Sequence, residues 1–216
     1  MALGRMMKGL FGGGRGAAAG PLGLDIGVAI QLHPTALEHV ADKLWFTPSP
    51  DPLGFTAQGH IDFGDGSMAL RYYTDDHEML QIICAGGVDD SSIQEVKLFV
   101  PLGSIYPEDE GWHEWEGENS RIGHPVFTLD DGPDYQRDWF KDDPGWAAPV
   151  EFAEHVIDDA NDENQVVQHV MLFARSLDIE PAFREYLLLS KEEHPDGHSV
   201  EALLGIDLEP GMFQTI

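Results

Sequence analysis

The clearest pattern of hydrophobic and polar positions lies between Phe55 and Val100, where short apolar segments alternate with turn residues. Asp65-Gly66, Asp75-Asp76 and Gly86-Gly87 separate the segments, and Asp-Gly between two alternating runs is a strong hairpin signal. This spacing predicts an antiparallel meander of four strands, with Pro101 ending the last strand. The predicted strands are Phe55–Phe63, Ser67–Thr74, Met79–Ala85 and Ile93–Val100.

Two other segments have the spacing of short helices. Thr35–Leu44 places apolar residues on one helical face after His33-Pro34, and Val200–Leu204 precedes Gly205, a common residue after a helix end. The pattern therefore predicts an α+β fold: β-rich, mainly antiparallel, built on the meander, with a few short helices.

The apolar runs between residues 151 and 190 fit either a strand or a helix, because short runs do not define a period. They are Glu151–Ile157, Val166–Arg175 and Phe183–Ser190. Polar turn material and Pro181 favour strands for the second and third runs.

Residues 103–149 are rich in Gly, Pro and Asp and hold four of the five tryptophans. A long irregular segment is usually functional or a linker. We expect one domain over 21–216, and two lobes (21–102 and 121–216) joined by this aromatic-rich segment are the alternative. Tryptophans in such a segment can line a groove, but they more often fix a loop to the core.

Charge divides the chain into a tail and a body. Residues 1–20 contain three basic side chains and no acidic one, so residues 21–216 carry nine basic against 39 acidic side chains. Binding to a nucleic acid backbone needs the opposite sign, so we expect no nucleic acid partner. An acidic body is suited to a protein partner with a basic surface.

The basic, Gly- and Ala-rich tail has one amphipathic face. A helix would bring five apolar residues together beside two cations, which is typical of a weak, reversible contact with a membrane surface or a partner. A frayed terminus without a role is the favoured interpretation, because Gly4 and Gly9 weaken so short a helix. The contact residues would be Leu3, Arg5, Met6, Met7, Lys8, Leu10 and Phe11.

The sequence contains no recognisable catalytic, cofactor or metal motif. His77 and its acidic neighbours occupy a turn, and the acidic positions after Asp159 lack the glycine and the final glutamate of a calcium loop. Cys84, the single cysteine, lies in an apolar run and is expected to be a buried thiol. We therefore predict no catalytic residue, no cofactor and no metal, and lean toward a protein that is not an enzyme.

If a pocket exists, the segment with clustered aromatic and titratable residues is the place to expect it. The candidate pocket residues are Trp112, His113, Glu114, His124, Asp134 and Tyr135.

Several short motifs together resemble the YjfK-like family of bacterial proteins of unknown function. They are Gly59–Gly66, Leu70–Asp76, Leu80-Gln81, Val170–Arg175, Glu185–Leu188 and Gly205–Leu208. The resemblance covers about residues 22–210 and supplies no catalytic residues. It implies a cytoplasmic bacterial protein, with a peripheral location at the inner membrane as the alternative, whose genetic context includes membrane-stress proteins. The leading interpretation is a non-enzymatic interaction or adaptor protein, and the alternative is an enzyme or small-ligand-binding domain with a dispersed site.

Overall fold

The computed structural model describes residues 20–108, 111–194 and 197–216, and these form an all-β protein. Its strands are β1 (Ala29–Leu32), β2 (Leu53–Gly54), β3 (Ala57–Asp62), β4 (Ser67–Tyr73), β5 (Met79–Ala85), β6 (Ile93–Ile105), β7 (Val126–Thr128), β8 (Asp134–Arg137), β9 (Val150–Asp158), β10 (Glu163–Leu177), β11 (Phe183–His194), β12 (Gly197–Asp207) and β13 (Phe213–Thr215).

Helical structure in the described residues is limited to single 3₁₀ turns. These are η3 (Pro21–Gly23), η4 (Asp90–Ser92), η5 (Trp112–Glu114), η6 (Arg121–Gly123) and η7 (Pro210–Met212). Within the described part of the chain, no helix could span a membrane.

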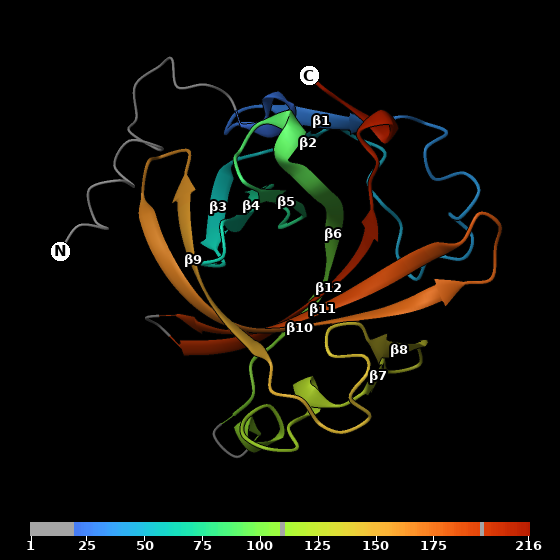
Figure 1. The fold of residues 1–216 in the computed structure, drawn as a ribbon, viewed down its shortest axis with the longest axis vertical. Helices are drawn as coiled ribbons and strands as arrows, with labels where there is room; N and C mark the ends of the chain where they lie inside the picture. The colour runs from blue at the N-terminus through green and yellow to red at the C-terminus, as the bar shows by residue number, and fades with distance from the viewer. Residues whose placement is uncertain (1–19, 109–110, 195–196) are drawn as a thin grey trace.

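Eight antiparallel strands close into a barrel. The order runs β3-β4-β5-β6-β12-β11-β10-β9, and β9 pairs again with β3 (Figure 1). The predicted meander is thus confirmed as one half of the barrel. The long hairpin of β10 and β11 forms the centre of the other half, with eleven paired positions from Val167↔Glu193 to Leu177↔Phe183.

Two layers cover opposite outer surfaces of the barrel (Figure 1). The small sheet β13-β1-β2 and the segment after β1 pack on the outside of β4, β5 and β6 through Ile30, Val40, Leu70, Leu80 and Leu98. On the other side, residues 112–147 pack on the outside of β10, β11 and β12. There the cluster includes Trp115, Ile122, Phe127, Phe173 and Leu187.

The α+β prediction is wrong, and both expected helices have other structures. Thr35–Leu44 forms a series of turns in which bonds from residue i to i−3 mix with two bonds to i−4, Ala41 to Leu37 and Leu44 to Val40. Leu37 and Val40 are buried, as the spacing suggested. The covering sheet and barrel bury them, so a regular helix is not required to do so.

The segment Val200–Leu204 is part of β12 and pairs with β11 on one edge and β6 on the other. Gly205 ends no helix. Instead, a Cβ at this position would lie 2.4 Å from Cδ1 of Phe99, so only glycine leaves room for that ring. Strand β6 also continues past Pro101, because β5 stops pairing at Phe99 and only β12 accompanies β6 from there.

The runs that fitted either state, 151–157, 166–175 and 183–190, are all strands, as expected for the second and third. Cys84 is a buried free thiol in β5, which confirms that prediction.

Candidate functional site

A cavity of about 250 Å³ lies inside the barrel, at the end where β3 and β5 finish and β6 and β9 begin. Eight-stranded barrels have an interior that side chains can fill or that can hold one small ligand. Apolar side chains from five strands make most of the wall: Ile61, Ile83, Phe152, Leu172 and Leu188. Phe63 and Trp139 add aromatic surface, and Arg71, Gln81, Glu95 and Asp138 supply the polar groups.

Charged and polar residues cross the barrel interior on one side of this cavity. Nη1 of Arg71 donates to Oε2 of Glu154 at 2.7 Å and to Oε1 of Gln168 at 2.8 Å. Glu154 also accepts from the Tyr73 hydroxyl at 2.6 Å and from Nε2 of Gln168 at 2.8 Å. These contacts join β4 to β9 and β10. Strand β4 is not a neighbour of either strand in the sheet, so the contacts must pass through the barrel interior.

The side chains of this network are buried from water, so they depend on one another for their hydrogen bonds and ion pairs. Arg71 and Glu154 are 4% and 0% exposed. Burial by itself lowers the pKa of Arg71, but Glu154 outweighs it and the net shift is upward. Burial, with the Glu154 charge, raises the pKa of the Tyr73 hydroxyl well above its usual value. Arg71 is therefore charged, and Tyr73 acts only as a hydrogen-bond donor to Glu154.

Glycine makes the approach of Glu154 possible. A Cβ on Gly59 of β3 would lie 1.8 Å from Oε1 of Glu154, on the adjacent strand β9. Glu154 therefore lies across the face of Gly59, where any other residue would displace the carboxylate from Arg71 and Tyr73.

Arg71 and Gln81 bring hydrogen-bonding groups to the cavity wall. Nε of Arg71 donates to Oε1 of Gln81 at 2.9 Å, and Nη1 serves Glu154 and Gln168. The guanidinium carries two further N–H groups on Nη2, and the Gln81 amide nitrogen makes no hydrogen bond with the described residues. Donors at the wall of an apolar cavity fix the orientation of a ligand that has an acceptor atom.

Aromatic rings line one side of the cavity. The Phe152 ring packs edge-on against Trp139 at 6.2 Å and against Phe63 at 5.2 Å, measured between centroids. Trp139 comes from the loop after β8, where the backbone N–H of Asp138 donates to the Leu172 carbonyl at 2.8 Å. This contact fixes the start of the loop on β10 and so positions the tryptophan.

The two acidic side chains of the lining are both paired. Glu95 lies 2.6 Å from Nζ of Lys97, which also contacts Asp207 at 2.6 Å. Asp138 pairs with Arg184. Each acid of the lining therefore has a cationic partner, although Lys97 is shared between Glu95 and Asp207.

Comparison with known proteins assigns the chain to a family. The model for a protein of unknown function, DUF2491, matches residues 6–214. The chain is also 32% identical over 176 residues to the uncharacterized protein YjfK of Escherichia coli strain K12, covering 82% of this chain and 79% of that protein. The chain belongs to the DUF2491 family. No solved structure gave a significant match.

The family match includes every strand of the closed barrel, from Ala57 to Asp207. It therefore contains the whole cavity, and it confirms the resemblance to YjfK-like proteins that the short motifs indicated. The family description assigns no residue a role.

The six pocket candidates from the sequence do not line this cavity. Trp112 packs edge-on against His198, and Tyr135 is fully buried, with its hydroxyl donating to Oε2 of Glu185 at 2.8 Å. His124 Nε2 lies 3.0 Å from the Asn119 carbonyl, and Asp134 accepts from Thr128 at 2.6 Å.

The remaining two candidates, His113 and Glu114, are exposed in η5, where Glu114 lies 3.7 Å from Arg121. Most of the aromatic-rich segment packs on the outside of β10, β11 and β12, where Trp112 and Trp115 fix a loop to the core. Trp139 of the same segment lines the cavity. The tail residues Leu3 to Phe11 lie outside the described residues, and their membrane or partner contact stays a prediction.

The cavity residues had a weaker sequence signal than the candidates. Arg71 stands in the middle of an apolar strand, and Glu154 stands between Phe152 and Val156. A lone charge in such a strand indicates an internal ion pair, but only the closed sheet shows which charges meet.

Proposed function

We propose that the barrel binds one small, mainly apolar and uncharged molecule that carries a hydrogen-bond acceptor such as a carbonyl. The observation that supports this most directly is the cavity of about 250 Å³ between the aromatic wall and the Arg71–Gln81 donors. Concave, mostly apolar sites with a few placed polar groups are the usual form of small-molecule sites.

The charge balance supports an uncharged ligand. Arg71 is neutralised by Glu154 at 2.7 Å, and the acids of the lining are paired with Lys97 and Arg184. An anion or a cation entering the cavity would have to compete with these internal pairs after losing its own water, which is costly at a buried site. A carbonyl oxygen needs only the donors of Arg71 and Gln81.

Binding can be tested with prodan, a neutral naphthalene ketone whose emission reports the polarity around it. We expect saturable binding of one prodan per chain with a blue-shifted emission. Ile83→Trp, which fills the cavity from a partly exposed position, should weaken binding by about tenfold or more, and Leu188→Phe should weaken it as well.

The matched control is Ile105→Trp, the same change on an exposed part of β6 outside the cavity. It should leave prodan binding within about twofold of the original protein. Equal loss in Ile83→Trp and Ile105→Trp, or no saturable binding at all, would reject the cavity as a ligand site. The adaptor role, the basic protein partner and the cytoplasmic location expected from the sequence stay predictions.

A further inference from the structure

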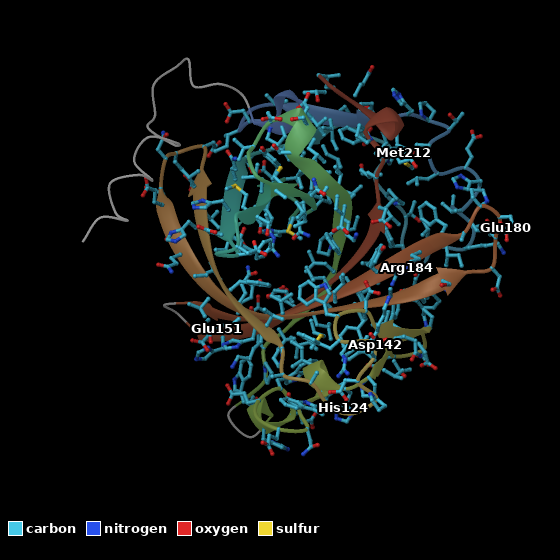
Figure 2. The ribbon with its side chains drawn as sticks, in the orientation of Figure 1. His124, Asp142, Glu151, Glu180, Arg184 and Met212 are labelled. Carbon is cyan, nitrogen blue, oxygen red and sulfur yellow. The ribbon has the colours of Figure 1, made fainter. Side chains whose placement is uncertain are left out.

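A second hollow, of about 340 Å³, lies outside the closed barrel where β8, β10 and β11 run together. We call it the cationic cleft. Figure 2 labels two nearby residues, Arg184 on β11 and Asp142 on the loop after β8. The cleft is lined by Gln136, Arg137, Asp138, Lys141, Ala174, Arg175, Ser176 and Arg184.

The charge of this lining is opposite to that of the rest of the body. It contains four basic residues and one acidic residue, Asp138. The whole of residues 21–216 has only nine basic residues against 39 acidic ones. Nearly half of the body's cations are therefore gathered around one small hollow, although a random surface of this protein would be acidic.

Arg137 is a buried cation without a carboxylate partner. It is 3% exposed, and its guanidinium donates only to backbone carbonyls: Gly123 at 2.7 Å, Asp143 at 2.6 Å and Phe140 at 3.2 Å. No acidic side chain of the described residues lies within ion-pair distance, and its Nε has no hydrogen-bond partner among them. Burying an uncompensated charge is costly, so a nearby anion would stabilise this arrangement.

The other three cations are only partly compensated. Arg175 is paired with the buried Glu185, and Arg184 is paired with Asp138, the one acid of the lining. Lys141 is exposed and forms no ion pair with the described residues. Among the lining residues and Glu185, positive charges exceed negative ones by two, from Arg137 and Lys141, and the exposed Asp142 and Asp143 beside Lys141 are outside this count.

We infer that the cationic cleft binds a small doubly charged oxyanion, a phosphate group, which is either free or part of a larger molecule. Two unbalanced positive charges match a dianion. Guanidinium and ammonium donors, with the hydroxyl of Ser176 and the amide of Gln136 in the same lining, suit the several acceptor oxygens of phosphate. A cation would be repelled by the same residues.

The test is a titration of the full chain with inorganic phosphate, followed by backbone amide shifts in the NMR spectrum. We expect saturable shifts that are centred on residues 136–141 and 174–184. Lys141→Gln should weaken phosphate binding by about tenfold, because it removes an exposed charge-assisted donor without disturbing a buried group. Arg121→Gln removes the same charge from an exposed arginine outside the lining and should change binding less than twofold.

A second titration with hexyl phosphate distinguishes the two sources of the group. Equal affinity for both compounds would indicate free phosphate, and clearly tighter binding of hexyl phosphate would indicate a phosphate carried by an apolar molecule. Linear, unsaturated shifts, or equal weakening by Arg121→Gln and Lys141→Gln, would overturn the inference, because either result means general screening. Prodan binding is measured separately, so an absence of phosphate binding at the cationic cleft would not count against the proposed ligand site inside the barrel.

Discussion

The inner and outer faces of the closed sheet differ in chemistry although they are built from the same strands. Outside, β4 to β6 and β10 to β12 present apolar side chains to two covering layers, with Leu80, Ile82, Phe173 and Leu187 fully buried. Inside, an ion pair, two glutamines and a tyrosine hydroxyl adjoin a cavity. The two outer faces are packed apolar clusters. The interior holds a third apolar cluster around Phe99, Val170 and Leu172, and beside it polar groups and space that stability alone would not require.

The largest expected effect concerns the buried ion pair. Arg71→Met removes the cation and leaves Glu154 buried without it, which should lower the free energy of unfolding by about 3–5 kcal/mol. Urea unfolding measures the loss. Arg121→Met is the control, since that arginine is exposed and lies 3.7 Å from Glu114 at the surface. It should cost less than about 1 kcal/mol.

Adding Glu154→Gln to Arg71→Met should recover part of the loss, because the uncompensated charge is then gone. If Arg71→Met costs no more than Arg121→Met, the interior ion pair does not exist as described.

Strands with one clear pattern could be predicted from the sequence, and their closure could not. The meander from Ala57 to Val100 depends on local turns, whereas the barrel depends on pairing between β9 and β3, about 100 residues apart. Alternation shows that a strand has two faces, but not which face points inward when both hold apolar residues. Thr35–Leu44 shows a related limit, because its spacing correctly placed Leu37 and Val40 in the core but assigned them to a helix.

The candidate site was harder to predict because its polar residues are scattered. Arg71, Gln81, Glu154 and Gln168 come from four strands, and none belongs to a compact motif. The clustered aromatic and titratable residues of the segment 112–135 predicted a pocket there. Trp115 and Tyr135 there serve the outer core instead.

Two glycines in neighbouring strands, Gly205 of β12 and Gly103 of β6, differ in the space around them. Gly205→Ala would place Cβ 2.4 Å from the Phe99 ring and 2.9 Å from the Leu98 carbonyl oxygen. The crowding should cost about 1–3 kcal/mol. Gly103→Ala, with no atom within 4 Å of the added Cβ, should change stability by less than about 0.5 kcal/mol. Thermal unfolding of both variants checks this, and equal stabilities would contradict the close packing of Phe99 inside the barrel.

Adjacent leucines on β11 test the two faces directly. Leu187 lies in the packed outer core and Leu188 lines the cavity. Leu187→Phe should cost about 1–3 kcal/mol through overpacking, while Leu188→Phe can use the cavity and should cost less than about 1 kcal/mol. Chemical denaturation gives both values. A larger loss of stability for Leu188→Phe than for Leu187→Phe would mean that the cavity does not lie on the Leu188 face of β11.

The last prediction concerns a pH dependence of stability. Burial raises the pKa of Glu192 on β11 to about 7. The folded protein therefore holds this proton more tightly than the unfolded chain, so the glutamate should reduce stability as pH rises from about 4.5 to about 7. Glu192→Gln should flatten the stability curve in that window.

The control is Glu193→Gln, which changes a neighbouring glutamate whose side chain is 42% exposed. Its curve should keep the slope of the original protein between the same pH values. A slope that is unchanged in Glu192→Gln would show that Glu192 titrates at an ordinary pKa.

The most direct measurement locates bound prodan by intermolecular NOEs in a methyl-labelled sample of the full chain. A ligand inside the barrel should give NOEs to the inward-facing methyl groups of Ile61, Ile83, Leu172 and Leu188, which line the cavity. The outward-facing methyl groups of Ile82 and Leu187 should give none. NOEs confined to the exposed side chains Leu102 and Ile105 would place prodan on the surface and contradict a ligand site within the barrel.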